Sequence, residues 1–146
     1  MERLSKNDYF LEIAKVVAKR STCLRRQYGA VVVKDDQIIS TGYNGSACGE
    51  LNCCDTGLCV REQLGVPHGE RYELCIAVHA ECNALIQAGR DANGAILYLA
   101  GFEDGKEIDN PEPCLLCSRI IKNAHIASVI TKEHISEVSG KHQMKV

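Results

Sequence analysis

The sequence predicts an α/β fold in a single domain. In some segments apolar residues recur at helical spacing, and in others they form short runs bounded by turn residues. Read along the chain, these segments give the order helix, strand, strand, helix, strand, helix, strand. The 146 residues suffice for one core, so we expect one domain over residues 1–146, with its core at about 5–131. The pattern fades in the tail at 132–146, which is expected either to form another helix or to lie loose.

The first half of the chain predicts one helix and a strand hairpin. A serine N-cap opens the helix at 5–20, and five apolar side chains recur on one face of it. These side chains are Tyr9, Phe10, Ile13, Val16 and Val17. Apolar strands are expected at 30–34 and 37–41, joined by a tight turn at the two aspartates 35–36 and followed by a turn at 42–45.

The second half predicts two more helices and two more strands. A helix at 78–88 ends before a glycine, and a strand at 95–100 lies between two glycines. A proline precedes the helix at 114–123, and the last strand covers 126–131. The connection at 102–112 is polar and acidic, so we expect it to be irregular.

One imidazole, two thiols and one carboxylate form the pattern that carries chemistry. His79 and Glu81 lie two residues apart at the start of one predicted helix, and Cys114 and Cys117 open another. A catalytic zinc ion takes three protein ligands and keeps a fourth position for water, whose pKa it lowers from about 16 towards 7. We therefore predict that His79, Cys114 and Cys117 hold zinc and that Glu81 stands beside the water. The alternatives are a closed structural zinc site, which needs a fourth ligand, or separately buried groups.

Charge and composition exclude several classes of function. The net charge of −2 and the isoelectric point near 6.2 argue against non-specific nucleic-acid binding but leave room for a nucleotide. No apolar run approaches the roughly 20 residues that span a bilayer, and no signal-peptide core is present, so we expect a cytoplasmic protein without a membrane partner. The nine cysteines are an odd number and are expected to be thiols and metal ligands rather than a disulfide framework.

The combination of these motifs resembles the cytidine/deoxycytidylate deaminase superfamily, and most closely the deoxycytidylate deaminases. The resemblance runs from about Tyr9 to Ile130. It rests on His79-Ala80-Glu81 with Asn83-Ala84, on Pro113-Cys114-x-x-Cys117, on Ser21-Thr22-Cys23 with Arg25-Arg26, and on the segments 29–34 and 42–45. It implies a three-layer sandwich in which a central mixed sheet has helices on both faces.

The resemblance also implies an activity. This is the zinc-dependent hydrolytic deamination of a cytosine nucleotide, dCMP to dUMP plus ammonia, with Glu81 passing protons from the water to the ring and to the leaving amine. A deaminase for another amino-bearing base or nucleoside would use the same chemistry, and a non-catalytic zinc scaffold is a further alternative. The connection at 102–112 departs from the family pattern: its carboxylates would repel a phosphate, whereas Lys106 would attract one.

Three residues are candidates for contact with the substrate. The resemblance favours Arg26 for the phosphate, since arginine binds phosphate well. The alternatives are a solvated surface pair with Arg25 or a charge at a helix C-terminus. The resemblance also favours Asn44, whose amide offers a donor and an acceptor to a sugar or base edge. The alternative for Asn44 is a turn residue in the left-handed conformation. The backbone near Ala80 is expected to position the pyrimidine.

The long segment at 46–74 contains several cysteines and needs a tether, which a closed zinc site of four sulfurs would supply. The predicted ligands are Cys23, Cys59 and Cys75 together with Cys53 or Cys54, of which Cys54 is the first candidate. Buried free thiols are the alternative. His68 in this segment is expected to be an ordinary loop residue. The resemblance implies such a second zinc, a homo-oligomer that is often a hexamer with sites near its interfaces, and allosteric control by dCTP and dTTP.

Overall fold

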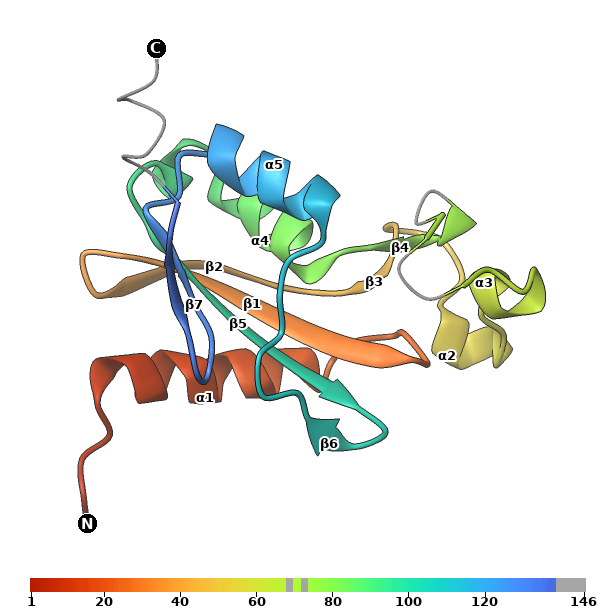
Figure 1. Cartoon of the computed structure of the whole chain (residues 1–146), viewed down its shortest axis with the longest axis horizontal. Coiled ribbons are helices and arrows are strands. Elements are labelled where there is room, and N and C mark those ends of the chain that lie inside the picture. Colours follow the sequence, from red (N-terminus) through yellow and green to blue (C-terminus); the bar gives the residue numbers. More distant parts are fainter. Residues whose placement is uncertain (68–69, 72–73, 139–146) are drawn as a thin grey trace.

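A central sheet with helices on both faces forms the body of the computed structural model, which describes residues 1–67, 70–71 and 74–138. The strands in spatial order are β2 (Gln37–Tyr43), β1 (Arg26–Lys34), β5 (Ile96–Glu103), β7 (Ser128–Ile130) and β8 (Ile135–Glu137). Strands β5 and β7 run parallel and the other neighbours antiparallel, so the sheet is mixed. Helix α1 (Lys6–Ala18) covers one face, and α4 (Ala80–Ala88) and α5 (Leu115–Asn123) cover the other (Figure 1). The predicted three-layer α/β sandwich is confirmed.

Strand β1 divides two apolar cores between the two faces of the sheet. Ala30 and Val32 belong to the core beneath α4 and α5, whereas Val31 and Val33 belong to the core beneath α1. Successive side chains of a strand point to opposite faces, so a strand covered on both sides is apolar without interruption. The two cores therefore explain the continuous apolar run that predicts this strand.

Helix α1 begins where the sequence predicts, but its buried face differs from the predicted one. The Ser5 hydroxyl accepts a hydrogen bond from the Asp8 N–H at 3.1 Å, as expected of an N-cap. The buried side chains are Phe10, Leu11, Ala14 and Ala18. Tyr9 and Val16, which were predicted to face the core, are 49% and 64% exposed. The backbone of the helix at Ala14 and Ala18 lies against Gly29 of β1, with no room for a side chain between them. The helix therefore turns the face that carries these two alanines towards the sheet.

The β1–β2 hairpin turns at Asp35 and Asp36, as predicted. Both residues have positive φ angles, 51° and 62°, which a two-residue hairpin turn of this hand requires. Both strands extend beyond the predicted limits, β1 to Arg26 and β2 to Tyr43. The extension follows from pairing, because Arg26 lies opposite Glu103 of β5 and Gly29 opposite Tyr43.

The connection at 102–112 is only partly irregular, so that prediction was wrong in its first half. Strand β5 continues to Glu103, and the chain turns at Asp104 and Gly105, which both have positive φ, into β6 (Lys106–Glu107). Strand β6 pairs back onto the end of β5. The tail forms the short strand β8 rather than a helix as far as it is described, and the rest of it, 139–146, lies outside the described residues.

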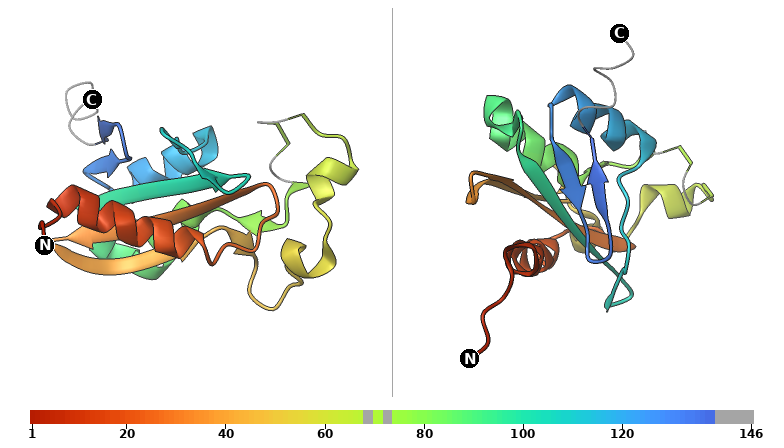
Figure 2. Two further views of the ribbon diagram at one scale, coloured as in Figure 1. Left: turned by 90° about the horizontal axis from the view of Figure 1, so that it is seen from below. Right: turned by 60° about the vertical axis from the view of Figure 1, so that its left-hand side comes forward.

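The segment at 46–74, here called the cysteine-rich segment, lies beyond one end of the sheet (Figures 1 and 2). It contains the short helices α2 (Cys53–Thr56) and α3 (Val60–Gln63), and the strands β3 (Gly45–Ser46) and β4 (Ala77–Val78) lie at its two ends. Elsewhere in the chain, the 3₁₀ helix η2 (Gly89–Ala92) follows α4. Strands β3 and β4 pair with each other and carry the chain back to the sheet. His68 lies outside the described residues. None of the described helices has the length and apolar character that crossing a membrane requires.

Candidate metal centre and active-site cavity

Two helix N-termini bring His79, Cys114 and Cys117 together. His79 and Cys114 are the N-cap residues of α4 and α5, and both have extended backbone. The His79 Nδ1 atom lies 3.2 Å from the Cys117 sulfur and 3.6 Å from the Cys114 sulfur. The ligand atoms of all three residues lie within 4.8 Å of one another. In a tetrahedral zinc site, bonds of about 2.0–2.3 Å place such atoms about 3.5–3.8 Å apart, so the three residues fit the ion.

The described residues supply three ligand side chains to this group, and a buried carboxyl group lies near them on α4. Among the described residues, no further His, Cys, Asp or Glu side chain joins the three within 4.8 Å. Glu81 follows in the first turn of α4, is 5% exposed, and lines the same cavity as His79 and Cys114. Three ligands and a neighbouring carboxylate are the arrangement that a catalytic, rather than a closed, zinc site needs.

Burial shifts the protonation of both His79 and Glu81. It raises the pKa of the Glu81 carboxyl, an effect that hydrogen bonds from the backbone and from Cys117 oppose. Burial, followed by the positive charge of Arg61, lowers the pKa of His79 and so favours the neutral imidazole that a metal binds. A carboxyl group with a raised pKa can both take up and release protons near neutral pH, which suits a general acid and base.

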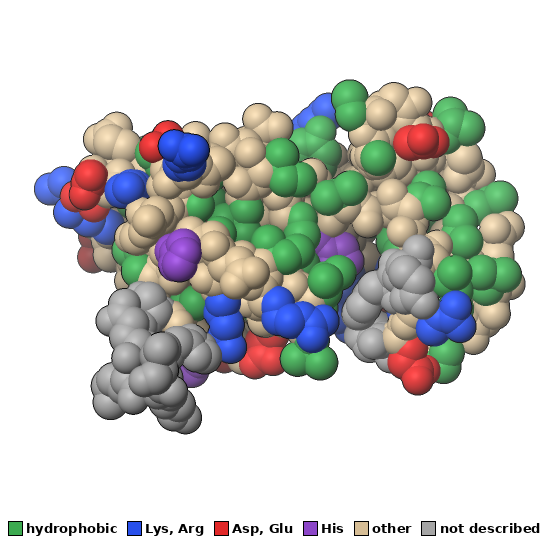
Figure 3. Space-filling model, turned by 90° about the horizontal axis from the view of Figure 1, so that it is seen from above, with side chains coloured by type: hydrophobic (Ala, Val, Ile, Leu, Met, Phe, Trp, Pro, Cys, Tyr) green, Lys and Arg blue, Asp and Glu red, His purple; other side chains and the backbone are tan. Residues whose placement is uncertain are grey.

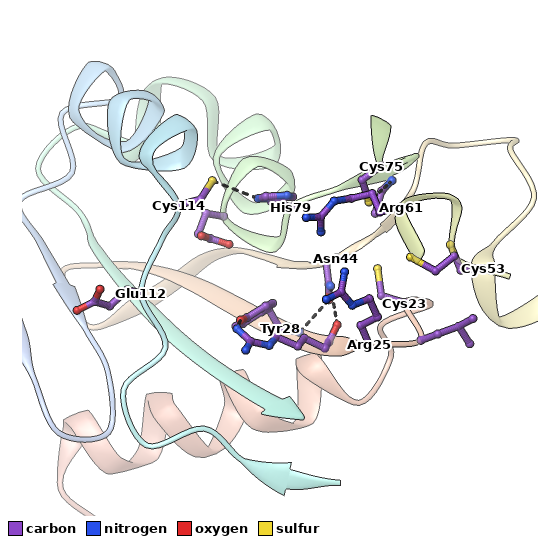
Figure 4. A pocket seen from close by; sticks show the side chains of 15 residues that line it. Cys23, Arg25, Tyr28, Asn44, Cys53, Arg61, Cys75, His79, Glu112 and Cys114 are labelled. Carbon is purple, nitrogen blue, oxygen red and sulfur yellow. Dashed lines mark hydrogen bonds between the residues drawn. The ribbon is translucent and has the colours of Figure 1, made fainter. Parts of the chain in front are cut away.

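A cavity extends from this group to the cysteine-rich segment (Figure 4). His79, Glu81 and Cys114 line one end of it. Three arginines, Arg25, Arg26 and Arg61, and the residues Tyr28 and Asn44 line its middle. The cavity therefore joins the candidate metal centre to three guanidinium groups, and a guanidinium is the kind of side chain that binds an anionic ligand such as a phosphate.

Asn44 lines the cavity and also holds the start of β1. Its Oδ1 accepts a hydrogen bond from the Tyr28 N–H at 2.8 Å, and its Nδ2 donates to the Arg26 carbonyl at 2.9 Å. The side chain is buried, and its backbone is not left-handed, so the turn-residue alternative does not apply. The amide continues the β1–β2 pairing just beyond the end of β2. One N–H and one lone pair remain for a ligand.

Arg26 and Ala80 occupy different positions relative to the cavity. The Arg26 Nε lies 2.9 Å from the Glu103 carboxylate, and its Nη1 lies 3.3 Å from the Tyr28 hydroxyl. Its neighbour Arg25 pairs with Glu62 at 3.2 Å. Ala80 is fully buried beneath β2 and is not among the residues that line the cavity, although its two chain neighbours are.

The comparisons with known proteins agree with this geometry. Residues 4–133 match the family model described as the cytidine and deoxycytidylate deaminase zinc-binding region. The chain belongs to this deaminase family. A deoxycytidylate deaminase of Schizosaccharomyces pombe is 39% identical over 130 residues, which are 88% of this chain and 37% of that protein. A deoxycytidylate deaminase of Mycobacterium phage D29 is 40% identical over 136 residues, 89% of this chain and 96% of that protein.

A solved structure extends the comparison to the fold. The apo crystal structure of the dCMP deaminase from cyanophage S-TIM5 superposes with a TM-score of 0.63 and 25% identity, over 89% of this chain and 84% of that one. The expected deaminase-like sandwich is thereby confirmed. This chain covers 37% of the length of the Schizosaccharomyces pombe protein and 96% of that of the Mycobacterium phage D29 protein. The region that this chain shares with the first protein is therefore only a part of that protein.

At the far end of the deaminase cavity, four thiols gather. They are Cys23, Cys53, Cys59 and Cys75. Burial first, and then the nearby thiols, raises the pKa of Cys23 to about 12. No three of these sulfurs lie within 4.8 Å of one another, so the cluster is more open than the group at His79. Cys54 is exposed, and its sulfur lies 3.9 Å from the Asp55 carboxylate. Cys53, and not Cys54, lines the cavity together with the other three thiols.

Sequence reasoning missed Arg61, which is 6% exposed and lines the cavity. Its guanidinium donates to the Pro67 and Glu70 carbonyls at 3.1 and 2.7 Å, and it extends from α3 into the cavity towards His79 (Figure 4). It is a single arginine in a polar segment without periodicity. The one available signal in the sequence is that it lies two residues after Cys59, a candidate metal ligand.

Proposed function

We propose that this protein catalyses the zinc-dependent hydrolytic deamination of a cytosine nucleotide, dCMP to dUMP plus ammonia. The observation that carries the proposal is the convergence of His79, Cys114 and Cys117 beside the buried carboxyl of Glu81, at the end of a cavity that contains arginines. Relatives of 39% and 40% identity that are named deoxycytidylate deaminase support the choice of substrate.

The residues of the chain divide the chemistry between them. A zinc ion held by His79, Cys114 and Cys117 would supply a water molecule whose pKa is lowered towards neutrality. Glu81 takes a proton from that water, and it then delivers protons to ring atom N3 and to the amine that leaves as ammonia. Burial raises the pKa of the Glu81 carboxyl, which suits a group that carries a proton between the water and the amine. Asn44 keeps one N–H and one lone pair for the sugar or base, and Arg26 lies at the cavity wall for the phosphate.

The experiment that tests the proposal is a substrate panel. Purified protein is offered dCMP, CMP, deoxycytidine, cytidine, guanine and adenosine nucleotides, and ammonia release is measured for each. The proposal requires dCMP to be the preferred substrate. Preference for another amino-bearing base would keep the reaction and change the substrate, and no ammonia from any compound would favour a non-catalytic zinc scaffold.

Substitution of Glu81 separates catalysis from metal binding. The Glu81→Gln variant should keep its zinc, because the carboxylate is not a ligand, while turnover falls by about 10²-fold or more. The matched control is Glu50→Gln, since Glu50 is exposed on the cysteine-rich segment. Substantial remaining turnover in Glu81→Gln, with normal turnover in the control, would remove Glu81 from its proposed role.

A second metal ion at Cys23, Cys53, Cys59 and Cys75 forms part of the proposal. Four buried or half-buried sulfurs at one end of the cavity support it, and a bound ion would draw them together and tie the cysteine-rich segment to β1. The ligand set replaces Cys54 by Cys53. The test measures zinc per chain in Cys53→Ser and Cys54→Ser. We expect a loss of one ion in the first variant only, and the reverse result would restore the set expected from the sequence.

We further propose that the protein is a homo-oligomer, such as a hexamer, in the cytoplasm. Large apolar side chains on the cysteine-rich segment support assembly, since Leu51, Leu58 and Leu64 are 70%, 52% and 61% exposed. Figure 3 shows hydrophobic side chains gathered over this end of the molecule. Nine cysteines without a disulfide suit a reducing compartment. Light scattering after size-exclusion chromatography tests the assembly, and cell fractionation tests the location.

A further inference from the structure

A further thiol, that of Cys82 on α4, lies beside one of the candidate metal ligands on α5. Cys82 belongs to α4, and its sulfur lies 3.8 Å from the sulfur of Cys117 in α5. Cys82 does not lie within 4.8 Å of all the ligand atoms, so it stands beside one ligand without being part of the set. The mechanism proposed above gives Cys82 no function.

The two thiols differ in their access to solvent. Cys117 is fully buried, whereas Cys82 is half-buried and lines a surface groove between α4 and α5. The walls of this groove include Ile86, Leu116 and Arg119, and none of these residues lines the substrate cavity. A small oxidant can therefore reach Cys82 without competing with substrate, and Cys82 in turn lies beside the ligand that solvent cannot reach.

We propose that Cys82 is a site of oxidative modification at which a hydroperoxide converts Cys82 and Cys117 into a disulfide, so that the catalytic metal ion is released. The proposal rests on the metal site of the proposed function. The Cys82 sulfur attacks one peroxide oxygen, the O–O bond breaks, and a sulfenic acid and one water form. The Cys117 sulfur then attacks the sulfur of Cys82, the S–S bond forms, and the oxygen leaves as a second water. The Cys82 thiol and the Cys117 thiolate are together oxidised by two electrons, the peroxide is reduced to two waters, and the second water takes one of its protons from solvent.

The consequence for the metal site follows from its small ligand set. The disulfide removes one of three ligands and leaves His79 and Cys114, too few to retain zinc against solvent. The sulfurs must approach from 3.8 Å to about 2.05 Å, a short movement of two side chains at the ends of adjoining helices. A dithiol reductant with added zinc restores the original site.

The experiment treats the full-length, zinc-loaded protein with hydrogen peroxide and follows zinc release with a chelating dye. Non-reducing tryptic digestion, followed by fragmentation of the linked peptides, then locates the disulfide. Fragmentation is needed because the peptide 72–90 carries Cys75 as well as Cys82, and the peptide 107–119 carries Cys114 as well as Cys117. We expect these two peptides to be linked, with Cys82 joined to Cys117. Zinc that is released from the unaltered protein but not from Cys117→Ser belongs to this site. In Cys82→Ala and Cys82→Ser, we expect this part of the release to be about 10-fold slower than in the unaltered protein.

Cys48→Ala is the matched control, because Cys48 is also accessible but lies outside both groups of candidate ligands. It should release zinc at the unaltered rate. Equal release from Cys82→Ala and the unaltered protein overturns the proposal, and so does a disulfide between Cys114 and Cys117 within the single peptide. The peptide link is also sought in metal-free protein. The zinc content of the untreated protein is compared with that of Cys117→Ser. If the two contents are equal and the disulfide still forms in metal-free protein, the proposed metal site is wrong but the reactivity of the thiol pair stands.

Discussion

At the scale of single residues, Asn44 supports the fold at the wall of the cavity. Both ends of its amide hold the backbone of β1, and the side chain lines the cavity. The structural contacts and the proposed contact with substrate predict two separate effects of replacement, and the stability effect can be measured without substrate.

Replacement of Asn44 by alanine should lower the free energy of unfolding by about 1–3 kcal/mol, since it leaves the Tyr28 N–H and the Arg26 carbonyl without their partner. Urea unfolding measures this loss. The control Asn52→Ala removes a half-buried amide whose hydrogen bond to Asp55 is exposed, and it should change stability by no more than about 0.5 kcal/mol. If KM for dCMP is unchanged in Asn44→Ala well below its unfolding transition, the substrate role of Asn44 is contradicted.

Tyr98 gives a prediction on pH. Its hydroxyl is buried under α1 and donates to the Asn7 Oδ1 at 2.8 Å, and burial, followed by the charge of Asp36, raises its pKa above the ordinary value of 10.0. The folded chain therefore holds this proton at a pH where the unfolded chain has lost it, and the stability contributed by Tyr98 falls as pH rises above 10. Tyr98→Phe should be about 1 kcal/mol less stable at neutral pH, and this deficit should shrink at alkaline pH. Urea unfolding at a series of pH values checks the trend, and a constant or growing deficit would contradict it.

At the scale of elements, the position of α4 depends on one glycine of β2. A Cβ atom at Gly42 would overlap the backbone of Ala80 and Ala84, so α4 lies against the strand with no room for a side chain. The same helix begins with His79 and carries Glu81 in its first turn. The close contact of helix and strand therefore sets the position of the candidate metal ligand and of the candidate acid and base.

Substitution of Gly42 by alanine should displace α4, lower stability by about 1–3 kcal/mol and weaken zinc binding at His79. The matched control is Gly29→Ala, because a Cβ there would overlap Ala14 and Ala18 of α1 on the opposite face of the sheet. The control should lose comparable stability and keep its zinc affinity. Competitive zinc titration of both variants distinguishes the two faces, and equal weakening in both would show that general destabilisation is responsible.

At the scale of the whole molecule, the candidate metal site joins two helices that lie on one face of the sheet. His79 opens α4 and Cys114 opens α5, and both helices rest on a core separate from the core beneath α1. Loss of the metal should therefore loosen one layer of the sandwich before the other.

Hydrogen exchange with and without a zinc chelator measures this difference. We expect amides in the first turns of α4 and α5 to exchange about 10-fold faster or more after metal removal, because the link between the helices is lost. Amides in α1 and in the middle of β1 serve as the internal control and should change little. Uniform acceleration across all three layers would mean that the metal stabilises the whole fold rather than this face.

The order of elements and their turn residues could be predicted because they depend on local chemistry. Ser5 caps its helix and the aspartates at 35–36 turn their hairpin through contacts with near neighbours. The buried face of α1 could not be predicted, because Tyr9 and Val16 are apolar but the close approach to Gly29 selects the alanine face. Strand β6 could not be predicted because its polar residues have little tendency to form a strand. They do so here because they pair with the end of β5.

The sequence by itself predicted that His79, Cys114 and Cys117 come together, and the structure groups these three side chains. The prediction was possible because an imidazole and thiols share affinity for one kind of metal ion. Only the tertiary structure decided that Cys53 and not Cys54 joins the other thiols, that Arg61 enters the cavity, and that Cys82 adjoins Cys117. Neighbours such as Cys53 and Cys54 are chemically identical, and the direction in which each points depends on packing against distant segments, which no local pattern records.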